Sequence, residues 1–230
     1  MSPVPGQDAL APVVQESTPS MIAARIREAI ASGLIPPGSQ LGEAHYARQL
    51  GVSRGPLREG LQRLTQEGLL ISHRNRGLFV IEMTRENVTD MYLAREAVER
   101  AAARSIHADT PATTARALMA VVDTMAAAAR RRDVSGVSVA DIEFHQVLVQ
   151  HARSPRLTRV HDTLLTETRM CIHALEPTYA MAETRVGEHR AIAESFEQGD
   201  AGLTDRMLIL HMQDAVLRLS GPEPATGRAG

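Results

Sequence analysis

The first third of the chain alternates short helical patterns with turn signals. Residues 1–18 mix Pro, Gly, Ser and Gln without periodicity, and we expect a disordered tail there. A helix is predicted to follow, with Thr18 as its N-cap, Pro19 at its first position and Gly33 at its end. The apolar face of this helix consists of Ile22, Ile26, Ala29 and Ile30.

Two further helices and a hairpin are predicted before residue 82. A short helix over 43–50 is separated by the turn "LGVS" from a helix over about 54–67, which has Ser53 as N-cap and Gly68 at its end. The segment "LLISHRNRGLFVIEM" has two β-rich runs around a polar centre, which is typical of a hairpin. Helix, helix, turn, helix and hairpin over residues 19–82 predict a winged helix-turn-helix.

Strand signals disappear after residue 84. Ala, Leu, Met, Val, Arg and Glu dominate, and Thr110 followed by Pro111 is typical of a helix start. We therefore predict an all-α bundle of about six helices over 84–220, a disordered tail over 221–230 and a mainly α fold overall. The expected breaks lie near 109–111, 133–138, 153–155, 176–178 and 199–202.

Composition narrows the class of protein. Cys171 is the single cysteine, which excludes an intrachain disulfide and favours a reducing compartment. No stretch approaches the length of a membrane span, and residues 1–18 lack the basic-then-apolar order of a signal peptide. We expect a cytoplasmic protein with no membrane partner.

Charge is shared unevenly between the two parts. Residues 20–82 hold eight arginines against five acidic residues, whereas the remainder holds seventeen against twenty-two. This asymmetry is expected when a small basic module meets a polyanion and an acidic module does not.

The predicted third helix has two different faces. In "VSRGPLREGLQRL", Arg54 and Arg58 are four residues apart and share one face, while the amides after Ser53 are available to a phosphate. Leucines occupy the other face and are expected to pack on the first two helices: Leu57, Leu61 and Leu64. Exposed arginines are usually solvated, but the turn, cap and hairpin around these two favour contact with DNA.

The run "LGEAHYARQLGVSRGPLREGLQRLTQEGLL", followed by "RGLFV", closely resembles the DNA-binding domain of GntR-family bacterial transcriptional regulators. The resemblance covers residues 20–82. It implies that double-stranded operator DNA is the partner, that Arg54 and Arg58 contact bases or phosphates, and that Ser53 contacts a phosphate. It also implies that Arg76 contacts DNA and that Gly77 lets the wing tip approach the minor groove.

Three positions depart from the GntR pattern. Ala44 stands where many members have Arg. Gly55 and Gly60 replace the usual Thr and Ala of the recognition helix. Each glycine is expected to cost about 0.5 to 1 kcal/mol of helix stability relative to Ala.

Four polar residues in the second part are candidate ligands of a metal site. Asp141 and His145 are four residues apart on one predicted helix, while His189 and His211 lie on two later helices. A histidine among apolar residues is more often a hydrogen-bonded core residue, and each one considered alone favours that interpretation. Together, one Asp and three His suit Zn, Ni or a similar divalent ion with open positions.

The segments "DIEFH", "GEHRAIAESFEQGD" and "MLILHMQDAV" resemble the FCD ligand-binding domain of the FadR subfamily, over about residues 84–220. The resemblance implies that Asp141, His145, His189 and His211 hold a divalent metal and that a carboxylate effector completes its coordination. Arg95 and Arg169 are predicted to line the effector pocket. Intrahelical ion pairs with Glu99 and Glu167 remain the alternative for these two arginines.

These patterns predict a homodimeric transcriptional regulator, more readily a repressor than an activator, whose operator affinity responds to a small organic acid. Two alternatives remain open. A metal with open positions could activate water in a metal-dependent hydrolase, although we find no HExxH motif, nucleophile elbow or phosphate loop. Alternatively, the bundle is only a dimerisation module with structural histidines.

Overall fold

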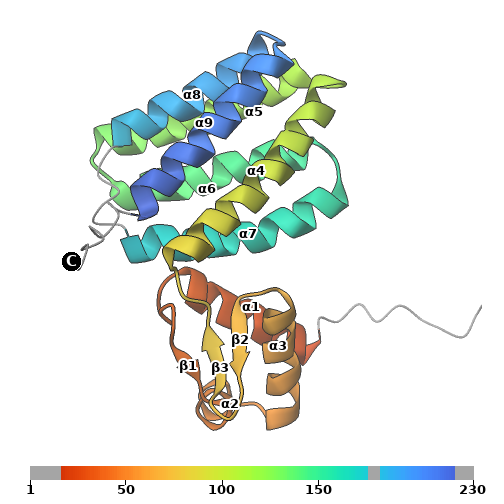
Figure 1. The fold of residues 1–230 in the computed structure, drawn as a ribbon, viewed down its shortest axis with the longest axis vertical. Coiled ribbons are helices and arrows are strands. Elements are labelled where there is room, and N and C mark those ends of the chain that lie inside the picture. The colour runs from red at the N-terminus through yellow and green to blue at the C-terminus, as the bar shows by residue number, and fades with distance from the viewer. Residues whose placement is uncertain (1–16, 176–181, 221–230) are drawn as a thin grey trace, which may run out of the picture.

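The computed structural model describes residues 17–175 and 182–220 (Figure 1). Within these ranges a small N-terminal module lies beneath an all-α bundle, as the sequence predicts. Most of the predicted N-terminal tail, the C-terminal tail and the break near 176–178 lie outside the described residues.

The N-terminal module contains three helices: α1 (Thr18–Ala31), α2 (Glu43–Leu50) and α3 (Arg54–Gln66). The predicted cap of α1 is wrong by one residue, because the Ser17 hydroxyl accepts from the Ser20 amide and Thr18 is already helical. Gly68 follows α3 at φ +83°, a left-handed conformation that glycine adopts without steric cost.

The wing is a three-stranded antiparallel sheet in the order β1-β3-β2. The predicted hairpin corresponds to β2 (Leu70–His73) and β3 (Gly77–Val80). A third strand was not predicted: β1 (Gln40–Leu41) pairs with β3, with Gln40 opposite Phe79. Two residues are too few to show a period, so only the tertiary pairing reveals this strand.

Within the described residues the C-terminal bundle has six helices, in agreement with the predicted number. The break predicted near 133–138 lies slightly earlier in the structure, because a helix already begins at Val134, where the Asp133 carboxylate caps it by accepting from the Gly136 amide. The helices are α4 (Arg85–His107), α5 (Pro111–Arg130), α6 (Val134–His151), α7 (Pro155–Leu175), α8 (Ala182–Glu197) and α9 (Ala201–Ser220).

Two apolar clusters fill the bundle, and a third fills the N-terminal module. One bundle cluster is centred on α5, α6 and α8, with Phe144 and Phe196 fully buried. The other joins the first half of α4 to α6, α7 and α9. None of the helices in the described part of the chain combines the length and hydropathy of a transmembrane segment.

The two modules share a packed junction on α7. Met170 of α7 is 1% exposed and belongs to the apolar core of the N-terminal module, together with Ile30 and Leu64. Gly33, at φ +74°, lies so close to α7 that a Cβ there would overlap the imidazole of His173. The bundle helix α7 therefore packs closely against the N-terminal module, so a movement of one is transmitted to the other (Figure 1).

Candidate metal centre and nucleic-acid interface

The predicted recognition helix presents its two faces as expected. Leu57, Leu61 and Leu64 are buried in the module's core, whereas Ser53, Arg54 and Arg58 are exposed. The Arg58 Nε donates to Oε2 of Glu43 at 2.7 Å across the helix-turn-helix. With the arginine side chain 63% exposed, this surface ion pair is weak and leaves the guanidinium accessible.

Ser53 occupies the N-cap position of α3 in an extended conformation, but its side chain makes no capping hydrogen bond. The prediction that Ser53 caps the helix is therefore correct for the backbone and wrong for the hydroxyl. An exposed hydroxyl beside uncapped N-terminal amides suits an anion, because both groups and the helix dipole attract negative charge.

The wing tip holds the other two predicted DNA-contacting residues. Arg76 is exposed in the turn, with its guanidinium carbon 5.3 Å from the centre of the Phe79 ring. Gly77 has φ +96°, and Gln40 Nε2 donates to the Arg76 carbonyl at 2.6 Å. The glycine therefore meets a backbone requirement of the turn.

The two unusual glycines of α3 have different surroundings. A Cβ at Gly60 would lie 2.9 Å from Cγ2 of Ile22 and 3.1 Å from the carbonyl oxygen of Pro19, whereas a Cβ at Gly55 would meet nothing within 4 Å. Gly60 therefore has a packing role besides its expected cost in helix stability, since its missing side chain allows α1 to approach α3.

Three histidines from three helices meet inside the bundle. His145 of α6, His189 of α8 and His211 of α9 are buried, and each offers a nitrogen within 4.8 Å of the other two. Nε2 of His145 and Nε2 of His211 are 3.1 Å apart. These residues are far apart in the sequence and converge only because the bundle closes.

Each of the three imidazoles is oriented through its other nitrogen. Nδ1 of His145 lies 2.7 Å from Glu99 Oε2, and Nδ1 of His211 lies 3.1 Å from Glu188 Oε2. Nδ1 of His189 lies 2.8 Å from the backbone oxygen of Arg185. When Nδ1–H donates to these acceptors, every Nε2 presents a lone pair, which is the usual arrangement around a protein-bound metal.

This tautomer leaves electron-rich atoms facing one another. The Nε2 of His189 is buried without a hydrogen-bond partner among the residues that the structure describes, and Oδ1 of Asp141 lies 3.3 Å from it. The lone pairs of His145 and His211 face each other in the same way. A cation between these atoms would satisfy them all, so the donor set fits a divalent metal.

Asp141 lies beside the three histidines but outside the group whose ligand atoms are mutually within 4.8 Å. Burial alone would raise the pKa of Asp141, but His189 and His145 oppose it and hold the pKa at about 2. Burial lowers the pKa of His189 to about 3 and that of His145 to about 4. At neutral pH the carboxylate is ionised and these two imidazoles are neutral, as metal ligation requires.

Glu99 is the centre of a buried polar network. Its Oε1 accepts from Nε and Nη2 of Arg95 at 3.1 and 3.0 Å and lies 3.0 Å from Nε2 of His161, while its Oε2 faces His145. Arg95 also donates to the Thr168 hydroxyl of α7. The intrahelical ion pair with Glu99, which was the alternative to an effector contact for Arg95, is therefore present. His161 is a buried residue of the core.

Arg185 is a residue that the sequence interpretation missed. It is 2% exposed, and burial lowers its pKa to about 10, partly opposed by the charge of Asp141. The missed signal is its spacing, because Arg185 precedes His189 by four residues and therefore shares a face of α8. Arg185 therefore places a buried positive charge near the candidate metal donors.

Arg169 lies elsewhere. It is exposed on α7 and lines a pocket against α1 and α6, which does not include the three histidines. Among the described residues, Arg169 makes no ion pair with Glu167 or with another carboxylate.

A winged helix-turn-helix joined to a helical bundle is the organisation of a DNA-binding transcriptional regulator. Residues 18–80 match the bacterial regulatory proteins of the gntR family, and residues 90–214 match the FCD domain. The chain belongs to the GntR family and carries an FCD domain.

Similar proteins share this organisation. An HTH-type transcriptional regulator of Agrobacterium vitis is 35% identical over 54% of this chain and 74% of its own length. A Paenarthrobacter nicotinovorans protein described as the probable repressor of a D-xylose utilization operon is 28% identical over 85% of this chain and 87% of its own. A solved GntR regulator from Rhodococcus superposes with a TM-score of 0.75 at 27% identity, over 91% of this chain and all of that one.

Proposed function

We propose that this protein is a cytoplasmic, homodimeric repressor of the FadR subfamily whose operator affinity is lowered by a small organic acid bound at a metal centre. The observation that carries the proposal is the convergence of three buried, individually oriented histidine nitrogens in a bundle that packs against a DNA-binding module. Two copies would place two recognition helices in half-sites about one helical turn apart.

The residues that would hold the metal are His145, His189 and His211, with Asp141 as the fourth donor. Imidazole and carboxylate donors suit Zn or Ni. A bound divalent metal would supply a positive charge that attracts an oxygen of the effector carboxylate. Glu99 already pairs with the guanidinium of Arg95, and Arg185 is a second buried arginine whose charge interacts with Asp141, so we expect the effector carboxylate to lie close to Arg185.

The switch would act through α7. Glu99 connects His145 to His161 and, through Arg95, to Thr168. Met170, two residues beyond Thr168, is seated in the core of the DNA-binding module. An effector that binds one arrangement of the domains more tightly than another shifts the population toward it, and the two recognition helices then no longer match their half-sites.

The test measures metal content and operator affinity together. Elemental mass spectrometry gives the metal content of protein purified without added metal. The affinity of this protein for an operator selected from random DNA is then measured in the presence of each member of a panel of small carboxylic acids. We expect about one metal per chain and one acid that weakens DNA binding. His189→Ala should lose both the metal and the response, while His151→Gln, on the same helix as His145 but outside the cluster, should keep both.

The two alternative functions give different results in the same experiment. A dimerisation module with structural histidines predicts metal-free protein of unchanged stability and no response to any acid. A metal-dependent hydrolase predicts ester hydrolysis that disappears in His145→Ala. Operator affinity that is identical across the panel with metal present would contradict the ligand switch.

A further inference from the structure

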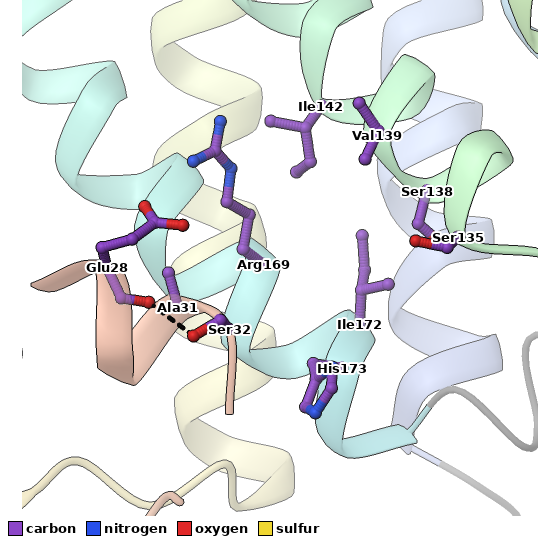
Figure 2. A pocket seen from close by; sticks show the side chains of 10 residues that line it. All are labelled: Glu28, Ala31, Ser32, Ser135, Ser138, Val139, Ile142, Arg169, Ile172 and His173. Carbon is purple, nitrogen blue, oxygen red and sulfur yellow. Dashed lines mark hydrogen bonds between the residues drawn. The ribbon is translucent and has the colours of Figure 1, made fainter. Parts of the chain in front are cut away.

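A pocket of about 410 Å³ lies at the junction of the two modules (Figure 2). Its walls come from the end of α1, the first half of α6 and the last part of α7. The volume is within the range of pockets that hold small metabolites. The three metal-centre histidines are not among its lining residues, so this pocket is separate from that site.

Two opposite charges line the pocket without being paired. Arg169 of α7 and Glu28 of α1 lie on the same side of it in Figure 2, and both are exposed. Among the described residues, neither side chain has an ion-pair partner within 4.0 Å. A guanidinium and a carboxylate separated in this way can bind the two ends of one zwitterion.

The remaining wall mixes apolar side chains with the polar residues Ser32, Ser135, Ser138 and His173. Val139, Ile142 and Ile172 line it, and Val139 is 64% exposed. The hydroxyl of Ser138, also a lining residue, is buried without a hydrogen-bond partner in the described structure. An apolar surface next to two opposite, unpaired charges favours a ligand with an aliphatic body.

We propose that this junction pocket is a second small-molecule site, which binds an aliphatic α-amino acid with its carboxylate on Arg169, its ammonium on Glu28 and its side chain on Val139, Ile142 and Ile172. The ligand joins the DNA-binding module to the bundle, since Glu28 belongs to one and Arg169 to the other.

The pocket also shares a helix with the metal centre. Val139 and Ile142 face the pocket from α6, while Asp141 and His145 of the same helix face the histidine cluster. A ligand in the pocket therefore contacts both α1, which packs on the recognition helix, and α6, which holds two of the metal donors. A bound ligand therefore favours the arrangement of the two modules in which it contacts both walls of the pocket.

Isothermal titration of the full chain with L-valine, L-leucine and L-isoleucine tests this assignment. We expect saturable binding of at least one of them. Its N-acetyl derivative, which lacks the ammonium, and its amide, which lacks the carboxylate, should each bind at least about tenfold more weakly.

Variants locate the site. Arg169→Gln and Glu28→Gln should each weaken binding about tenfold or more. Arg156→Gln, an exposed arginine of the same helix that does not line the pocket, should leave binding unchanged. His189→Ala, which removes a proposed metal ligand, should also retain amino-acid binding, so the junction pocket can be confirmed even if the metal-centre proposal fails.

Two results would overturn the proposal: no binding of any of the three amino acids, or binding that survives Arg169→Gln.

Discussion

Oε2 of Glu99 on α4 lies 2.7 Å from Nδ1 of His145 on α6. Burial would raise the pKa of this carboxyl, but His145 and Arg95 outweigh it and hold the pKa well below its usual range. The carboxylate thus orients one proposed metal ligand while its other oxygen contacts two further side chains, Arg95 and His161.

Replacing Glu99 should therefore weaken both the fold and the metal centre. Glu99→Gln leaves the buried charge of Arg95 uncompensated, and we expect a loss of about 3 to 5 kcal/mol in the free energy of unfolding. Loss of the orienting carboxylate should lower metal affinity by about 10- to 100-fold. Urea unfolding and metal titration measure the two effects.

The matched control for this variant is on the same helix. Glu96 pairs with Arg100 at the same spacing as Glu99 with Arg95, but that pair is partly exposed. Glu96→Gln should cost less than about 1 kcal/mol and leave metal affinity unchanged. Equal effects of the two variants would show that burial of the Glu99 network is unimportant.

Arg58 should determine operator specificity. Arg58→Ala removes an exposed guanidinium, and we expect specific binding to weaken by about 1 to 3 kcal/mol with little change in thermal stability. Glu43→Gln removes its ion-pair partner and a negative charge facing DNA, and should strengthen binding, most visibly at low salt. Fluorescence anisotropy with a selected operator measures both. Unchanged affinity of Arg58→Ala would refute the assignment of α3 as the recognition helix.

The two glycines of α3 should respond oppositely to the same substitution. Gly55→Ala adds a methyl group in open space and should stabilise the protein by about 0.5 to 1 kcal/mol. Gly60→Ala should destabilise it by about 1 to 3 kcal/mol, because the new Cβ would press on Ile22 and the backbone of Pro19. Chemical denaturation of the two variants compares the effects, and stabilisation by both would mean that the α1–α3 contact is looser than described.

Glu167 should make stability depend on pH. Burial, with nearby Asp90, raises the pKa of Glu167 from 4.5 to about 7. The folded state then binds more protons than the unfolded state, so the contribution of this group falls as the pH rises from about 4.5 through 7. Glu167→Gln should raise the melting temperature at pH 8 and give no such gain at pH 4. Asp90→Asn should produce a smaller shift of the same sign, and equal gains at both pH values would contradict this origin.

Local patterns were sufficient to predict most of the elements. The period of Ile22, Ile26 and Ile30 located α1, and the turn "LGVS" located the boundary between α2 and α3. Errors occurred where a neighbour decides the outcome. The strand at Gln40–Leu41 exists because β3 pairs with it, and Gly60 is required because Ile22 lies opposite.

The candidate site also combines features that local spacing predicts with features that depend on contacts between distant helices. Asp141 and His145 were predicted to share a helix face because spacing within one helix is local, whereas the role of Glu99 depends on α4 crossing α6. Arg95 and Arg169 looked equivalent in the sequence, but one is neutralised inside the bundle and the other faces the junction pocket.

By itself the sequence determined the winged helix-turn-helix, the helical bundle and the two-faced recognition helix, because helical period, caps and turns depend on neighbours in the chain. The spacing of Asp141 and His145 is local in the same way, whereas His189 and His211 joined them as candidate metal donors through the resemblance to the FCD domain. Only the tertiary structure decided which nitrogen of each histidine is available, which arginine is buried beside Asp141, and that α7 reaches the DNA-binding core through Met170. Those features arise from contacts between segments far apart in the sequence, whose burial and hydrogen-bond partners no local pattern records.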